Sequence, residues 1–174
     1  MDENGRRSRL EALWAAHASA VLAYARRRAG ATTADEVLSD VFLVAWRCLD
    51  EVPDDARLWL LACARRSLAN HQRADRRRLR LSRRMVSAGA SPTTLVELRD
   101  TTLARALATL SERDREALLL TAWEGLSGDQ AAAVLGCSPQ AFRVRAHRAR
   151  KRLASALGAA ETSSPQPTME TCND

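Results

Sequence analysis

Aromatic residues, glycine and proline are scarce in this chain of 174 residues: aromatics make up 4% of it, and it holds 7 Gly and 5 Pro. No stretch alternates β-branched and polar residues in the manner of a strand. Leu and Ala carry most of the apolar content, so we expect an all-α fold. At this length the chain suits one or two small domains rather than one large core.

Long apolar runs and clustered cysteines are also missing. No segment approaches the length that a membrane-spanning helix needs, and the N-terminal stretch MDENGRRSRLEALW has no apolar signal-peptide region. The four cysteines are dispersed, with no C-x-x-C and no His at ligand spacing. We therefore expect a cytoplasmic protein with no membrane insertion, no metal site and no cofactor, whose cysteines are buried thiols.

Catalytic patterns are absent as well. The sequence has no glycine-rich phosphate loop, no G-x-S-x-G and no paired carboxylates at catalytic spacing. His17 falls on an apolar stripe, as a packed core or boundary histidine does, and His71 and His147 lie among arginines, where phosphate contact suits them better than catalysis. We expect no enzymatic activity.

Positive charge is what the chain has in excess. Its net charge is +6 and its pI is near 10, which favours a polyanionic partner. Residues 32–56 hold seven acids and one Arg, whereas residues 57–84 hold ten Arg and one Asp. Either these two segments pair with each other as adjacent helices, or the acidic one docks on a basic protein surface while the basic one faces nucleic acid.

Capping patterns predict where several helices begin. Capping boxes are found at Ser8, Thr33 and Ser127, each followed three residues later by Glu or Gln. Ser138 precedes a proline, which suits the first position of a helix because its missing N–H needs no partner there.

Apolar periodicity divides the chain into two small helical domains. Three stripes predict three helices over residues 8–81, and the periodicity stops over residues 82–94, where Ser, Gly, Thr and Pro indicate a flexible linker. Four more helices are predicted over residues 95–157, and residues 158–174 are expected to form a disordered tail.

The second domain has the pattern of a helix-turn-helix. Ser127 precedes the short segment GDQAAAVL, Gly136 permits the positive φ of a tight turn, and Pro139 opens a long basic helix. Residues 135–153 hold six cations and no acid. The apolar stripe of this helix consists of Phe142, Ala146, Ala149, Leu153 and Leu157.

The cationic side of this helix is expected to lie against DNA rather than to be a merely solvated charged face. Because the first residues of such a helix reach base edges in the major groove, Gln140, Arg143 and Arg145 are candidates for reading bases. The later cations suit phosphate contacts; these are Arg148, Arg150, Lys151 and Arg152.

Two stretches resemble a known family. ADEVLSDVFLVAWR (34–47) is similar to the polymerase-binding helix of extracytoplasmic-function (ECF) sigma factors of bacterial RNA polymerase. The segment at residues 110–153 resembles their C-terminal promoter-reading domain, and the order of the two modules also matches. The resemblance covers roughly residues 8–157. It implies a dissociable polymerase subunit that directs the enzyme to promoters and helps to melt them.

The resemblance also implies site residues and partners. The polymerase-binding positions are Glu36, Asp40, Phe42, Trp46 and Arg47. Those for the minus-ten element are Trp59, Arg65, Arg66, Asn70 and Arg73, and those for the minus-thirty-five element are Ser138, Gln140, Arg143, Arg145, Arg148, Arg150 and Lys151. The implied partners are the clamp of the largest polymerase subunit, the flap of the second, and promoter DNA. An anti-sigma factor is a further partner common in the family.

A stand-alone helix-turn-helix regulator is the alternative. Such a protein would need a dimer interface and a ligand or receiver domain, and it would bind a palindromic duplex without polymerase. The N-terminal half, divided into acidic and basic segments, is too small for an obvious receiver domain.

Overall fold

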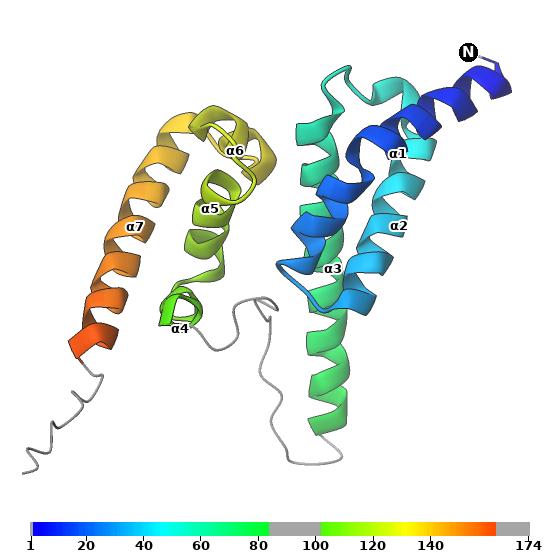
Figure 1. Ribbon diagram of the computed structural model, residues 1–174. Coiled ribbons are helices and arrows are strands. Elements are labelled where there is room, and N and C mark those ends of the chain that lie inside the picture. Colours follow the sequence, from blue (N-terminus) through cyan, green and yellow to red (C-terminus); the bar gives the residue numbers. More distant parts are fainter. Residues whose placement is uncertain (1, 84–101, 163–174) are drawn as a thin grey trace, which may run out of the picture.

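The computed structural model describes residues 2–83 and 102–162, and every element within them is helical (Figure 1). In the first domain three long helices pack side by side: α1 (Glu3–Arg26), α2 (Ala31–Arg47) and α3 (Ala56–Arg83). A short 3-10 turn, η1 (Leu49–Glu51), joins α2 to α3.

The second domain holds four helices: α4 (Thr102–Ala108), α5 (Glu112–Ala122), α6 (Gly128–Leu135) and α7 (Pro139–Thr162). In Figure 1 the side of this domain formed by α5 and α6 faces α3, and α7 lies on its far side. The predicted all-α fold of two small domains is therefore confirmed. The larger part of the predicted linker lies outside the described residues.

Two of the predicted helix starts are wrong. α1 begins at Glu3, because the Asp2 side chain accepts a hydrogen bond from the Gly5 amide at 3.0 Å, and Ser8 lies inside the helix. α2 begins at Ala31, after Gly30 in an extended conformation, rather than at Thr33. A matching capping pattern does not exclude an earlier helix start, so tertiary packing and the first usable cap decide.

The capping box at Ser127 is confirmed. The Ser127 hydroxyl accepts from the Gln130 amide at 3.2 Å, and the Gln130 side chain accepts from the Ser127 amide at 2.9 Å. Gly136 ends α6 with a φ of 66°, the left-handed conformation that favours glycine. The turn of the predicted helix-turn-helix thus forms where the sequence indicated it.

Helix α7 is longer than the sequence analysis predicted. It continues to Thr162, whereas the predicted domain ended at residue 157. The segment ASALGAA at residues 154–160 is rich in alanine, the residue with the highest helix propensity, and this carries the helix into the region expected to be a tail. Residues 163–174 lie outside the described part of the chain.

The core of the first domain is formed by apolar side chains that recur every three or four residues on each helix. Each of these side chains is at most 1% exposed. They include Val21, Tyr24 and Ala25 of α1, Val37, Val41 and Ala45 of α2, and Leu60, Leu61 and Ala64 of α3. In the second domain the predicted stripe of α7 is confirmed, because Phe142, Ala146 and Ala149 are each no more than 2% exposed. The repeating alanines allow the helix backbones to approach closely.

A buried ion cluster joins the two domains. Arg28, at the end of α1, is only 6% exposed. Its Nε donates to Glu116 at 2.7 Å and its Nη1 to Glu124 at 2.9 Å. The Tyr24 hydroxyl donates to Glu116 at 2.8 Å, and Arg27 donates to Glu124 at 2.6 Å. Two acids of the second domain are therefore neutralised by cations of the first.

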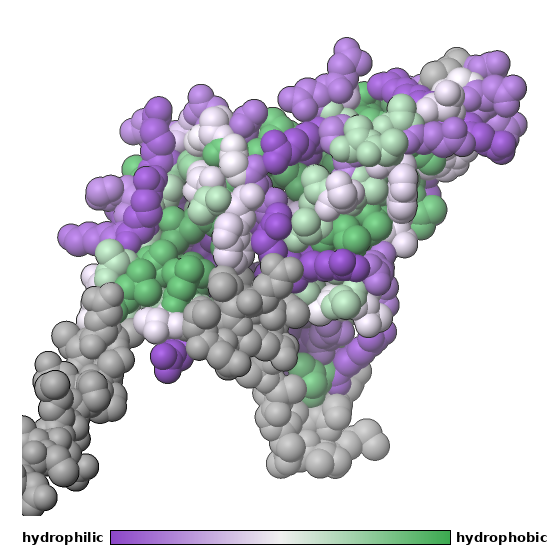
Figure 2. Space-filling model, in the orientation of Figure 1, coloured by the Kyte–Doolittle hydropathy of each residue, from purple (hydrophilic) through white to green (hydrophobic). Residues whose placement is uncertain are grey.

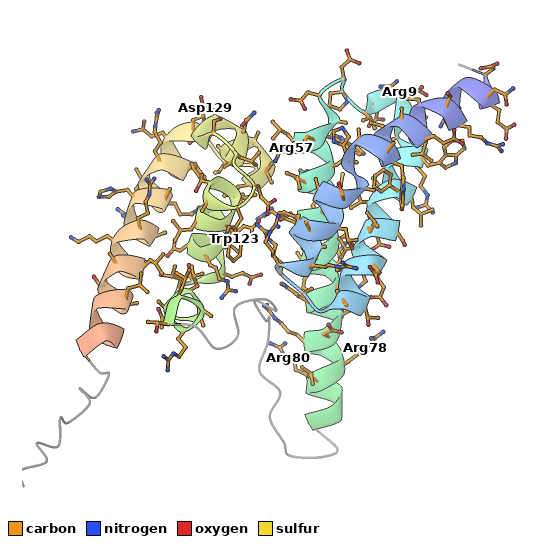
Figure 3. The ribbon with its side chains drawn as sticks, viewed as in Figure 1. Arg9, Arg57, Arg78, Arg80, Trp123 and Asp129 are labelled. Carbon is orange, nitrogen blue, oxygen red and sulfur yellow. The ribbon has the colours of Figure 1, made fainter. Side chains whose placement is uncertain are left out.

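Electrostatics keep the central guanidinium of this cluster charged. Burial by itself lowers the pKa of Arg28, but the carboxylate of Glu116 and its other partners raise that pKa overall. The guanidinium also lies over the Tyr24 ring, 3.7 Å from the ring centroid. At the start of α3, Arg57 adds another link by donating to the Glu124 carbonyl at 2.7 Å (Figure 3).

The other sequence-based expectations concern membranes and cysteines. Within residues 2–83 and 102–162, no helix is apolar over a length that could cross a membrane. Cys63 is a buried thiol whose pKa is raised by burial, as expected, whereas Cys48 and Cys137 are half-buried. Cys172 lies outside the described residues.

Removal of the central cation should loosen the contact between the domains. We expect Arg28→Ala to lower the free energy of unfolding by about 3 kcal/mol. The carboxylates of Glu116 and Glu124 would stay buried but would lose the guanidinium that neutralises them both. Urea titration followed by circular dichroism measures this. The matched control is Arg26→Ala, which removes an exposed pair with Asp35 at 3.7 Å and should change stability by less than about 0.5 kcal/mol. Equal effects of the two variants would contradict the prediction.

Candidate polymerase and nucleic-acid interfaces

One face of α2 combines acidic and apolar side chains that are exposed to solvent. Glu36, Asp40 and Arg47 follow one another at helical spacing and are exposed or half-exposed. Between them lie Leu43, which is 54% exposed, and Val44, which is 38% exposed. Large apolar side chains beside carboxylates on one surface are typical of a protein-binding face.

Phe42 and Trp46, two of the predicted polymerase contacts, lie elsewhere. Phe42 is 5% exposed, and its ring centroid lies 4.6 Å from that of Trp14, a residue of α1 that is 48% exposed. Trp46 is half-buried beneath the guanidinium of Arg6, 5.2 Å from its ring centroid. The exposed apolar residues of this region are therefore Trp14, Leu43 and Val44, which the sequence analysis missed. Helical spacing from Glu36 and Asp40 would have identified Leu43 and Val44.

Asp40 is held in place by two side chains of α3. Its Oδ2 accepts from the Ser67 hydroxyl at 2.6 Å and lies 3.0 Å from His71 Nε2. The hydrogen bond from Ser67, together with the contact to His71, lowers the pKa of the Asp40 carboxyl despite its partial burial. His71 also lies 3.4 Å from Glu36. The predicted phosphate contact of His71 is wrong in this structure, because two acids of α2 occupy both of its ring nitrogens.

The opposite charges of α2 and α3 do not pair through arginine. Among the described side chains, no arginine of α3 forms an ion pair with an acid of α2. Ser67 and His71 are the side chains of α3 that contact acids of α2, whereas Arg76 pairs with Glu112 of the second domain at 3.4 Å. The arginine-rich surface of α3 thus stays open to other anions.

The residues predicted to meet the minus-ten element divide between two sides of α3. Trp59, Arg66, Asn70 and Arg73 recur every three to seven residues and form one stripe, partly or fully exposed along its length. Arg65 lies on the neighbouring side, where it lines a cleft toward the second domain together with Arg73. Figure 3 shows Arg78 and Arg80 farther along the same helix, on its two sides.

The start of α1 fixes the turn that leads into α3. Arg6 donates to the Trp46 carbonyl and to Asp50, both at 3.0 Å. Arg9 donates to the Val52 carbonyl at 2.7 Å (Figure 3). These contacts hold the turn between α2 and α3 beside the Trp59 end of the stripe.

The outer side of α7 carries most of the predicted minus-thirty-five residues. Gln140, Arg143, Arg148 and Lys151 are all exposed on one face, and Figure 2 shows hydrophilic side chains projecting there. Val144 lies among them and is 43% exposed, a position that the sequence analysis did not select. An apolar side chain on such a face can contact the methyl group of thymine.

The remaining predicted residues of α7 have partners within the protein or face the cleft. The Ser138 hydroxyl accepts from the Ala141 amide at 3.2 Å and so caps the helix. Arg150 donates to its own helix at the Ala146 carbonyl, 3.2 Å away. Arg145 is half-buried and lines the interdomain cleft.

Arg152 pairs with Asp114, a buried acid of α5, rather than with phosphate. Asp114 needs a cation in its buried position, whereas the Arg152 side chain is 62% exposed, so the phosphate contact predicted for Arg152 stays a prediction.

An exposed basic recognition helix behind a tight glycine turn defines the class of protein as a helix-turn-helix DNA-binding protein. Comparison of the sequence with protein families adds two matches: Sigma-70 region 2 over residues 13–78, and Sigma-70, region 4 over residues 101–153.

Individual relatives agree with these matches. The chain is 37% identical over 137 residues to the ECF RNA polymerase sigma factor SigC of Mycobacterium tuberculosis, covering 70% of this chain and 68% of the relative. It is 34% identical over 144 residues to the RNA polymerase sigma factor CnrH of Cupriavidus metallidurans, covering 74% and 75%. The chain belongs to the sigma-70 family of RNA polymerase sigma factors and is of the ECF type. Its function is promoter-specific initiation of transcription by RNA polymerase.

Solved structures show the same fold. The sigma factor RpoE of Bartonella quintana, determined in complex with the anti-sigma factor NepR, matches with a TM-score of 0.67 and 26% identity over 85% of this chain and 96% of that one. CnrH in complex with the cytosolic domain of CnrY matches with a TM-score of 0.58 and 32% identity, covering 86% and 88%.

The lowered pKa of Asp40 makes a pH-dependent contribution to stability. We expect Asp40→Asn to lower the free energy of unfolding at neutral pH by about 1 kcal/mol, a small value because the side chain is half-exposed. A carboxyl whose folded-state pKa is depressed stabilises the fold above its ordinary pKa and loses this effect as the pH falls through the folded value. The difference between the two proteins should therefore shrink as the pH drops below 3.8.

Urea titrations at several pH values measure this difference. Asp54→Asn, at an exposed acid in the turn before α3, should change stability little at any pH. A difference between wild type and Asp40→Asn that is the same at neutral and at acidic pH would contradict the prediction.

Proposed function

We propose that this sigma factor binds the clamp of the largest polymerase subunit through the exposed face of α2. Leu43 and Val44 supply the apolar area, while Glu36 and Asp40 attract a basic surface. Phe42 supports this face from beneath, since it is buried against Trp14. The observation that carries the proposal is the combination of solvent-exposed apolar and acidic side chains on one helix face.

The stripe of α3 is proposed to capture the minus-ten element as single-stranded DNA. Trp59 offers a partly exposed ring on which an unstacked base can stack, and Arg66 and Arg73 offer charge to the phosphates. Flipping a base costs a few kcal/mol, which stacking together with phosphate contacts can offset. The turn held by Arg6 and Arg9 would place this end of α3 firmly against the strand.

The outer face of α7 is proposed to read the minus-thirty-five element in the major groove. Gln140 and Arg143, near the start of the helix, are placed for base edges, and Arg148 and Lys151 for phosphates. Arg150 and Ser138 can contribute at the edges of the same surface.

Further partners and the place of action follow from the family. RpoE was determined with the anti-sigma factor NepR, and CnrH with the cytosolic domain of CnrY, so we propose that an anti-sigma factor also controls this chain. The flap of the second polymerase subunit is the proposed partner of the C-terminal domain. We place the protein in the cytoplasm with its polymerase, as a subunit that binds and directs rather than as a catalyst.

Multi-round transcription in vitro with purified bacterial core polymerase on a genomic fragment library tests these assignments. Wild type should give discrete start sites. We expect Asp40→Arg combined with Leu43→Ala to abolish both the start sites and the co-purification of core polymerase. Glu3→Arg, which reverses an exposed charge at the start of α1, should change neither.

A second double variant separates DNA reading from polymerase binding. The protein with Gln140→Ala and Arg143→Ala should still bind core polymerase but lose promoter selection. Tight binding of particular duplexes by the protein alone, with no polymerase-dependent start sites, would instead favour a stand-alone regulator.

Val144 gives the recognition face a specific test. A buried methyl contact contributes about 0.8 kcal/mol, roughly a fourfold change in affinity. We expect deoxyuridine in place of one thymine of the minus-thirty-five element to weaken wild-type holoenzyme binding by that factor. Val144→Ala should bind both DNAs with the same, lower affinity. Equal sensitivity of both proteins to the missing methyl group would exclude this contact.

A further inference from the structure

A cleft of about 530 Å³ lies between the two domains. Its walls come from α1 and α3 on one side and from α5, α7 and the turn after α6 on the other. Figure 3 shows side chains from the two domains converging in this region. Its volume is within the range of small-molecule sites, and it is too small for a DNA duplex. The arginines that line it are Arg27, Arg28, Arg65, Arg73, Arg76, Arg113, Arg115 and Arg145.

The positive charge of this cleft is largely uncompensated. Glu112 and Glu116 are the acids in its lining. Glu112 pairs with Arg76, and Glu116 with Arg28. Five of the lining arginines have no carboxylate within ion-pair distance among the described residues: Arg65, Arg73, Arg113, Arg115 and Arg145.

These five arginines come from both domains and line the same partly open cleft, where Arg73 and Arg113 are exposed and the other three are half-buried. Their mutual repulsion opposes the closed arrangement that the pairs of Glu116 and Glu124 favour. Two buried donors in the lining, Arg27 Nε and Arg28 Nη2, also have no hydrogen-bond partner in the described structure. Buried donors without acceptors are unfavourable, so an anion would relieve both the repulsion and the missing hydrogen bonds.

We propose that this interdomain cleft binds a small polyphosphate anion and that the bound anion holds the two domains together. Guanidinium groups present paired N–H donors that match phosphate oxygens. A ligand that contacts arginines of both domains binds only the closed arrangement and stabilises it by mass action. Because bound phosphate neutralises the repulsion across the cleft, closure and binding reinforce each other.

The lining selects for phosphate rather than for a base. Tyr24 is the single aromatic residue in the lining of this cleft, and its side chain is fully buried, so no ring is available for stacking. We therefore expect inorganic tripolyphosphate and a nucleoside triphosphate to bind with affinities within about threefold of each other, and a nucleoside not to bind.

The anion would also compete with promoter DNA. This consequence rests on the proposed function, because Arg73 belongs both to the stripe proposed to bind the minus-ten element and to the lining of the cleft. A guanidinium that binds polyphosphate in the closed cleft is not free for DNA phosphates. Polyphosphate binding would therefore reduce promoter engagement by the same chain.

Isothermal titration of the full-length protein with sodium tripolyphosphate, in magnesium-free buffer near 0.1 M salt, tests the site without DNA. We expect one site per chain, at least tenfold weaker in Arg113→Ala combined with Arg115→Ala. Arg7→Ala combined with Arg105→Ala removes the same charge from exposed positions outside the cleft and should change the affinity less than twofold. Circular dichroism checks that both variants fold.

The proposal is overturned if wild type shows no saturable binding at millimolar tripolyphosphate. It is also overturned if both double variants weaken binding equally, because that result would indicate an effect of general surface charge. Parallel titrations with ATP and adenosine distinguish the sources of the phosphate: equal affinities of ATP and tripolyphosphate indicate the phosphate chain alone, and much tighter ATP binding indicates a nucleotide.

Competition in a promoter-binding assay without nucleotides forms the second arm. Tripolyphosphate should reduce promoter binding by holoenzyme that contains wild type, and much less with Arg113→Ala combined with Arg115→Ala. Anion binding that is confirmed while promoter binding is unaffected would overturn only the link to promoter reading and leave the anion site standing. The proposed function is tested by transcription with Asp40→Arg combined with Leu43→Ala, whereas the anion site is tested by titration without polymerase. Failure of one proposal is therefore distinguishable from failure of the other.

Discussion

The buried guanidinium of Arg28 is the constraint on which the arrangement of the two domains depends. A cation that is 6% exposed needs carboxylate partners, and its own domain supplies only a carbonyl and the face of Tyr24. Both carboxylates, Glu116 and Glu124, come from the second domain. Charge neutralisation therefore requires α5 and the turn after it to sit against the end of α1. Apolar packing adds to this contact, because the buried core of the first domain continues into Ala131 and Val134 of α6, which lies against α3.

Helix α3 serves a different partner on each of its sides. One side carries Ser67 and His71, which hold Asp40 of the proposed polymerase face. A second side carries the stripe that begins at Trp59, and a third carries Arg65 and Arg76, which face the second domain. The helix proposed to bind polymerase and the helix proposed to bind DNA are thus joined by side-chain contacts. One rigid element would therefore orient both proposed surfaces.

The interface between the domains balances attraction against repulsion. Glu116 and Glu124 attract Arg27 and Arg28, and they lie close to arginines that have no acid of their own. A shared apolar core also joins the two domains, and its stability depends mainly on buried area. The charged part of the interface, by contrast, responds to any anion that enters it. In the proposed mechanism, the unpaired arginines of the cleft make the closed arrangement sensitive to small polyanions.

Local sequence by itself determined the helices, the two domains, the glycine turn and the apolar stripe of α7, because helical periodicity and capping act over a few residues. It also placed Gln140, Arg143 and Lys151 on an open face. Only the tertiary structure decided that Phe42 is buried, that His71 meets acids rather than phosphate, and that Arg152 pairs with Asp114. The bonds from Arg28 join residues 88 and 96 positions apart. No local pattern predicts such ion pairs. Helical periodicity shows which side chains share a helix face, but it does not show which charged residue far along the chain will pair with them.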